Sequence, residues 1–144
     1  MSRMIFVNLP VADVEAAKRF YVELGMKVNP LFTTDDCASI VVEDNIVIML
    51  LSEQRFRDFI VNDVADRDTT EVLICLSADS REDVDALCDN ALAAGAGAWK
   101  EPMDQGFMYG RSFRDLDGHV IEVMWMDVQA ATGVSPEEAV AAAV

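Results

Sequence analysis

Glu122 is the carboxylate in this sequence whose neighbours make a chemical role most plausible. It lies within Val120-Ile121-Glu122-Val123-Met124, a run that is otherwise apolar. A carboxylate in such surroundings is costly unless it has a partner. We therefore predict that Glu122 either anchors a ligand or transfers a proton, or else pairs with a cation such as Arg111. His119 is the only histidine in the chain, and strand alternation places it opposite Glu122, which favours an exposed or interface residue over a catalyst.

Strand alternation assigns other residues to the face that carries Glu122. If helices cover the uniformly apolar strand faces, a concave and mostly apolar cleft remains on the other side, and small-molecule sites usually have this composition. Arg111 could bind a carboxylate or an enolate there. Alternatively, the strand face that carries Tyr109 and Arg111 covers the core at a sheet edge or forms a dimer contact. The predicted ligand-binding residues are Phe6, Asn8, Met49, Leu73, Cys75, Tyr109, Arg111, Glu122 and Met124.

The elements that must position these residues occur twice. The first half predicts a strand over residues 3–9 ended by Pro10, a helix over 13–24 closed by Gly25, and strands over 38–43 and 46–52. The second half predicts a strand over 71–77, a helix over 81–94 capped by Asp79 or Ser80, and strands over 98–101, 107–115 and 119–126. The two helices match at a constant offset of 70 residues, and the two hairpins at 73.

This repeat predicts an α+β fold of two tandem βαβββ modules. Module 1 covers about residues 3–52 and module 2 about 71–126, within a single domain over 1–126. The linker over 53–70 begins with a short helix over 53–60. Residues 127–144 form an Ala-rich tail, in which Ser135-Pro136 has the composition of a helix start.

Two stretches of the sequence carry a family resemblance. Residues 11–26 contain Val11-Ala12-Asp13-Val14 and later Phe20-Tyr21 and Leu24-Gly25, and residues 114–123 contain Asp115-Leu116-Asp117-Gly118 and Glu122. Together they resemble the opening and closing motifs of the vicinal oxygen chelate superfamily, which holds glyoxalase I, bleomycin-resistance proteins and extradiol dioxygenases. The resemblance implies that the two modules form an eight-stranded incomplete barrel around a cleft.

Enzymes of that superfamily bind a divalent metal through residues on four strands. The resemblance places these positions at Phe6, Met49, Leu73 and Glu122. Phenylalanine and leucine have no lone pair to donate, and a thioether is a poor ligand for such metals. We therefore expect no metal cofactor. The alternative is a displaced divalent-metal site formed by Asn8, Glu71 and Glu122.

Composition narrows the range of partners. The 144 residues carry 26 acidic and 11 basic side chains, a net charge of −15, so we expect neither nucleic acid nor an anionic membrane as a partner. The longest apolar run is far too short to span a bilayer, and the N-terminal residues do not resemble a signal peptide. Three widely spaced cysteines fit reduced thiols in the cytoplasm. Small domains of the resembling family commonly pair, so we expect a homodimer.

The preferred function hypothesis is a glyoxalase/bleomycin-resistance-like protein that binds a small apolar or aromatic molecule without the family's metal. The alternative is a glyoxalase-like lyase or isomerase, or a dioxygenase, that uses a displaced metal site or Glu122 as its base. A third hypothesis is a purely structural dimer whose cleft is filled by its own side chains. Of the four family positions only Glu122 carries a competent metal ligand, and this favours the hypothesis of a metal-free binding protein.

Overall fold

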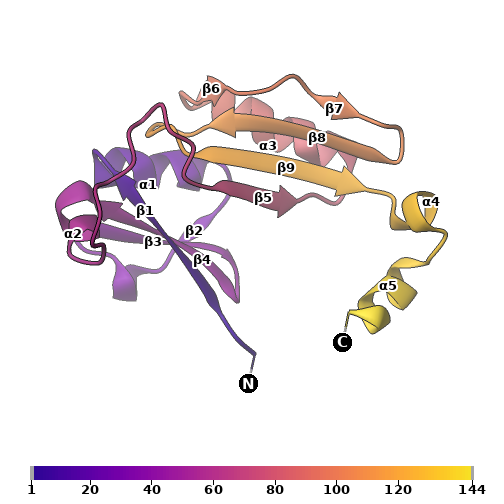
Figure 1. Cartoon of the computed structure of the whole chain (residues 1–144), viewed down its shortest axis with the longest axis horizontal. Helices are drawn as coiled ribbons and strands as arrows, with labels where there is room; N and C mark the ends of the chain where they lie inside the picture. The colour runs from indigo at the N-terminus through magenta and orange to yellow at the C-terminus, as the bar shows by residue number, and fades with distance from the viewer. Residues whose placement is uncertain (1, 144) are drawn as a thin grey trace.

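The chain forms two βαβββ units, one from each half of the sequence (Figure 1). The structure is a computed structural model and describes residues 2–143. The first unit contains β1 (Ile5–Val11), α1 (Val14–Glu23), β2 (Lys27–Val28), the 3-10 turn η1 (Pro30–Phe32), β3 (Cys37–Glu43) and β4 (Ile46–Ser52). After α2 (Glu53–Arg57), the second unit contains β5 (Leu73–Ser77), α3 (Arg81–Ala93), β6 (Gly97–Ala98), β7 (Met103–Asp104), β8 (Met108–Arg114) and β9 (Val120–Met126).

Both long helices begin at side-chain caps. The Asp13 carboxylate accepts a hydrogen bond from the Ala16 amide at 3.0 Å, and the Ser80 hydroxyl accepts one from the Asp83 amide at 3.0 Å. Each cap satisfies an amide that has no partner within its helix. The sequence therefore predicted both helices correctly, and Ser80 rather than Asp79 caps α3.

The strands differ from the predictions in three places. β1 continues through Pro10 to Val11 instead of ending at Pro10. This is tolerated because β1 is an edge strand, where a residue without an N–H group need not interrupt a ladder. The two-residue strand β2 was not predicted. The strand predicted over 98–101 is replaced by two short pairings, β6 and β7, on either side of Pro102.

The strands form two open sheets, with orders β1-β4-β3-β2 and β5-β9-β8-β6, and β7 adds to the second sheet by pairing with β8. In each sheet the first strand of the unit runs parallel to the last, β1 with β4 and β5 with β9. Helix α1 packs on β3 and β4, and α3 packs on β8 and β9. Within residues 2–143 the sheets do not close on each other, so the α+β fold with an incomplete barrel is confirmed.

The hydrophobic core runs through both units. The Phe20 ring of α1 lies 6.2 Å from the Phe113 ring of β8, measured between centroids, in an edge-to-face arrangement. Both side chains are buried in one cluster with residues of α1, β1, β3, β4, α3 and β9. Helices α1 and α3 therefore cover one side of the paired sheets and leave the other side free of them.

Two short helices follow β9, α4 (Val128–Thr132) and α5 (Pro136–Ala142). At α5, the Ser135 hydroxyl accepts from the Glu138 amide while the Glu138 carboxylate accepts from the Ser135 amide. This reciprocal pair satisfies two helix-end donors. No helix among residues 2–143 is both long enough and apolar enough to span a membrane.

Candidate functional site

Most of the residues predicted to line a cleft lie on the faces of the two sheets that α1 and α3 do not cover. In the first sheet, Asn8 pairs with Met49, and Phe6 pairs with Val47. In the second, Cys75 pairs with Glu122, and Leu73 pairs with Val120. Residues that pair directly point to the same face. The open face of the first sheet carries Phe6, Asn8 and Met49, and that of the second carries Leu73, Cys75, Glu122 and Met124.

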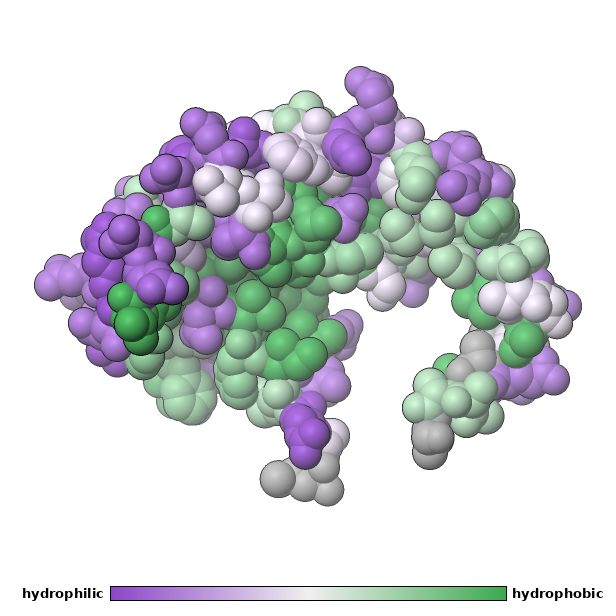
Figure 2. All heavy atoms as spheres, in the orientation of Figure 1, coloured by the Kyte–Doolittle hydropathy of each residue, from purple (hydrophilic) through white to green (hydrophobic). Residues whose placement is uncertain are grey.

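This open side forms a broad bay bounded by β1 and the C-terminal helices, and apolar residues line much of its inner wall (Figure 2). The Phe6 and Leu73 side chains remain 55% and 56% exposed, respectively. Large apolar side chains with that exposure are available to a ligand or to a partner.

Tyr109 and Arg111 do not belong to this face, so their assignment to the cleft needs correction. Arg111 pairs with Val123 in the register of β8 and β9, which turns its side chain toward α3. Its guanidinium donates to Asp85 at 3.0 Å and to Asp89 at 2.9 Å, and the Tyr109 hydroxyl donates to Asp85 at 2.6 Å. These bonds fasten α3 to its sheet. The predictions missed them because strand alternation gives two faces without saying which one a helix covers.

Glu122 lies in a hollow of about 430 Å³ on the open face of the second sheet. The hollow is lined by Lys100, Glu101, Met103, Gly110, Arg111, Ser112, Glu122 and Met124. Among the described residues Glu122 forms no salt bridge, because Arg111 is held by α3 instead. Its neighbour across the ladder is Cys75. Partial burial of the sulfur, and then the Glu122 charge, raise the pKa of the Cys75 thiol. A raised pKa disfavours the reactive thiolate form of Cys75.

The residues at the family's metal positions do not fit a metal ion. Phe6, Met49 and Leu73 all lie on the open face, as the resemblance implied, but they offer one thioether and no other donor atom. Within residues 2–143 there is no group of three or more His, Cys, Asp or Glu side chains placed to hold a metal.

The residues of the alternative displaced site are not brought together either. Asn8 and Glu71 line a cavity at the junction of the two units, whereas Glu122 lines the separate hollow on the second sheet. The Glu71 carboxylate is also engaged with His119.

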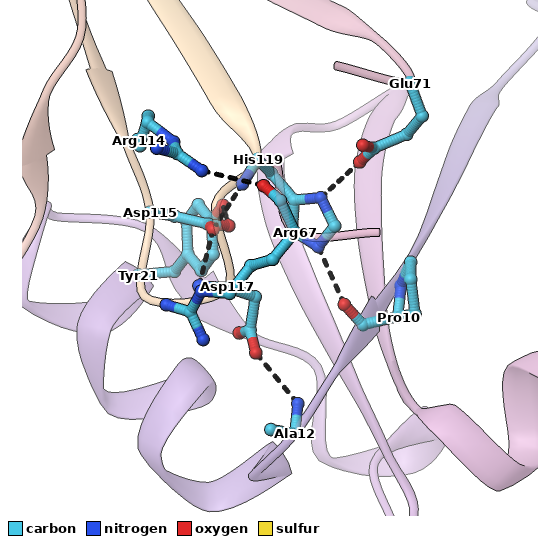
Figure 3. A network of polar contacts seen from close by, with 9 residues as sticks. All are labelled: Pro10, Ala12, Tyr21, Arg67, Glu71, Arg114, Asp115, Asp117 and His119. Carbon is cyan, nitrogen blue, oxygen red and sulfur yellow. Dashed lines mark hydrogen bonds and ion pairs between the residues drawn. The ribbon is translucent and has the colours of Figure 1, made fainter. Parts of the chain in front are cut away.

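His119 is buried, with 4% of its surface exposed, and not an exposed residue as strand alternation suggested. Its Nε2 lies 2.7 Å from the Pro10 carbonyl oxygen of β1, and its Nδ1 contacts the Glu71 carboxylate (Figure 3). A carbonyl can only accept, so Nε2 carries a proton. Burial lowers the pKa of His119, but Asp115, the Pro10 carbonyl and Glu71 outweigh it, and the pKa is raised overall. His119 thus links the second unit to the first through the bond from its Nε2 to the Pro10 carbonyl.

A second link between the units was missed by the sequence analysis. The buried Tyr21 hydroxyl of α1 donates to Asp115 at 2.6 Å, and the other Asp115 oxygen accepts from the amides of Asp117 and His119 at 2.9 Å each. Burial, and then the Asp115 charge, raise the pKa of Tyr21 well above its ordinary value. Both residues stand in the two stretches that carry the family resemblance, which was the available signal.

The turn before β9 is held closely against the segment that precedes β5. Arg114 donates to the Arg67 carbonyl at 2.7 Å, and Arg67 donates in turn to the Leu116 carbonyl. Gly118 has a φ of +89°, and a Cβ there would stand 3.1 Å from the Arg67 carbonyl oxygen. A side chain at residue 118 would therefore be strained and crowded. Asp117 accepts from the Ala12 amide at 2.8 Å, and its burial raises its pKa above the ordinary value.

Two βαβββ units with open sheet faces and a shared core are the architecture that the family resemblance implied. Comparison with protein families supports the same assignment. The model of the Glyoxalase/Bleomycin resistance protein/Dioxygenase superfamily matches residues 3–123. The chain belongs to this superfamily. No curated protein matched the chain significantly.

Solved structures show the same fold. The hypothetical protein SA1046 from S. aureus is 28% identical, with a TM-score of 0.74 over 87% of this chain and 95% of that one. A glyoxalase-related enzyme from Fulvimarina pelagi is 19% identical, with a TM-score of 0.73 over 89% and 91% of the two chains. A glyoxalase/bleomycin resistance protein/dioxygenase family enzyme from Burkholderia phytofirmans PsJN is 19% identical, with a TM-score of 0.72 over 87% and 99%. At 19% identity the last two support the fold alone.

Proposed function

We propose that this protein binds a small apolar or aromatic molecule on its open sheet face, without the metal used by enzymes of its superfamily. The observation that carries the proposal is the chemistry of the open face. Phe6, Met49 and Leu73 supply apolar surface where metal ligands would stand, and Glu122 remains the single carboxylate of that set. A mostly apolar wall with few polar groups is the usual composition of a ligand site.

Glu122 is the group that fixes the orientation of the ligand in this proposal. Its hollow also contains the Ser112 side chain and Lys100, so a polar group on the ligand has both a donor and an acceptor within the hollow. Met103 and Met124 adapt to the apolar part because a thioether side chain is flexible and polarisable.

The protein acts as a cytoplasmic homodimer in this proposal. The open faces leave Phe6 and Leu73 more than half exposed, and a second copy that covers part of the bay would remove that apolar surface from water. The three cysteines are free, which suits a reducing compartment.

The test combines metal analysis with a fluorescent probe. Protein purified without chelator should contain no stoichiometric Ni, Zn, Fe or Mn. The neutral aromatic dye N-phenyl-1-naphthylamine should bind and fluoresce, and Met124→Trp should reduce its affinity at least about tenfold by filling the hollow. Leu92→Trp, on the exposed side of α3, is the matched control and should leave dye binding unchanged.

Two results would contradict the proposal. One is a tightly held equivalent of metal that Glu122→Ala removes. The other is dye binding that is equal in Met124→Trp and in the wild type.

A further inference from the structure

A second cavity lies at the junction of the two units, separate from the Glu122 hollow. Its volume is about 600 Å³, and its walls come from β1, α2, the segment over 60–67 and the turn before β9. In Figure 1 this segment crosses from α2 toward β5, beside β1. The apolar part of the lining includes Val7, Leu9, Phe56, Ile60, Val64 and Val72. A cavity with this volume and apolar lining can enclose a small organic molecule.

The polar part of the lining is strongly acidic. Five carboxylates line the cavity, against the two basic side chains of Arg67 and His119. The carboxylates belong to Glu53, Asp63, Asp66, Glu71 and Asp117.

Both basic side chains already form hydrogen bonds within the protein. His119 bonds the Pro10 carbonyl and Glu71, and Arg67 donates to the Leu116 carbonyl. Figure 3 shows this arrangement, with the His119 ring between Glu71 and Pro10. The hydrogen bond to the Leu116 carbonyl leaves the positive charge of Arg67 in place, but the five carboxylates still make the lining negative overall.

Three of the five carboxylates in the cavity lining are not engaged in ion pairs with other described residues. Glu53, Asp63 and Asp66 are exposed. Within residues 2–143 none of these three takes part in a salt bridge. Their negative potential is reinforced by the net charge of −15. An anion entering the cavity would be repelled, whereas a cation would be attracted.

We propose that this cavity binds a small organic cation with an apolar body, that is, a hydrophobic amine or quaternary ammonium compound. The apolar body packs against Val7, Val64 and Val72, and the cationic head lies toward the carboxylates of the 60–67 segment. This site is distinct from the open-face site, and neither depends on the other.

The experiment uses three probes with alkyl tails of about the same length, seven or eight carbons, and different heads: octyltrimethylammonium, 1-octanol and octanoate. Binding to the full-length protein is followed by NMR through the methyl signals of Val7, Val64 and Val72. We expect affinity to decrease from the cation to the alcohol to the carboxylate. Added NaCl should weaken the binding of the cation and leave that of the alcohol unchanged, because salt screens exposed charges.

Paired variants separate local charge from net charge. Asp63→Asn with Asp66→Asn should reduce affinity for octyltrimethylammonium about three- to tenfold and leave octanol binding unchanged. Glu23→Gln with Asp35→Asn removes the same charge from exposed positions outside the cavity and should have a much smaller effect. Val64→Trp should weaken binding of both probes by filling the cavity.

The inference fails if octanoate binds as tightly as the cation, or if the methyl signals of the three valines do not shift. Equal losses in the two charge-removal pairs would also overturn it, since the cavity carboxylates would then have no special role. The methyl signal of Met124 reports the open-face hollow in the same spectra. A shift there without shifts at the valines would contradict this inference while leaving the proposed function intact.

Discussion

Removal of the Tyr21 hydroxyl should measure how strongly the two units are held together. Tyr21 and Asp115 are 1% and 4% exposed, and the hydroxyl donates to the carboxylate at 2.6 Å. A hydrogen bond to a charged group is worth about 1.5–3 kcal/mol. Tyr21→Phe keeps the ring in the core, so the loss comes from the hydrogen bond and from the carboxylate oxygen left without its donor.

We therefore expect Tyr21→Phe to lower the free energy of unfolding by about 1.5–3 kcal/mol. For a domain of about this size each kcal/mol corresponds to roughly 2–4 °C in Tm, so the midpoint should fall by roughly 3–12 °C. Urea denaturation followed by tryptophan fluorescence gives the free energy, and calorimetry gives Tm.

Tyr109→Phe is the matched control because it deletes the same atom. The Tyr109 hydroxyl also donates to a carboxylate at 2.6 Å, but the Asp85 side chain that accepts is 47% exposed. Water can replace the lost donor there, so the change should stay within about 0.5 kcal/mol. Equal losses in the two variants, or a loss below about 0.5 kcal/mol in Tyr21→Phe, would refute the argument that burial makes the Tyr21 bond strong.

Two further predictions concern His119 and the open face. Because the folded-state pKa of His119 is raised above 6.5, its stabilisation is fully present below that pH and is lost as pH rises through the folded-state pKa. His119→Gln should thus cost about 1–2 kcal/mol at pH 6 in urea denaturation, and less at pH 9; a pH-independent cost would contradict this. Light scattering at micromolar concentration should give twice 15.9 kDa. Phe6→Asp with Leu73→Asp should give a monomer, and a monomeric wild type would refute the dimer.

Local patterns in the sequence were enough to predict the two repeated units. The caps at Asp13 and Ser80 and the helical spacing of Val14, Ala17 and Phe20 depend only on neighbours in the chain. Strand alternation also depends on local geometry alone, so it correctly separated Glu122 and Met124 from Ile121 and Val123. The short strands β2, β6 and β7 could not be predicted in this way, because each has two residues, too few to show an alternating pattern.

Contacts between distant segments were decided only by the tertiary structure. The sequence of its own strand allows Arg111 to face either the cleft or α3. Its side chain faces α3, where it forms ion pairs with Asp85 and Asp89. Strand alternation placed His119 opposite Glu122 and suggested an exposed residue. In the folded chain its ring instead bonds the Pro10 carbonyl of β1. The sequence by itself determined the repeat, the helix ends and the missing metal ligands, since these follow from residue type and near neighbours. The partners of Glu71, Arg111, Asp115 and His119 lie up to 109 residues away in the chain, and only folding brings them together.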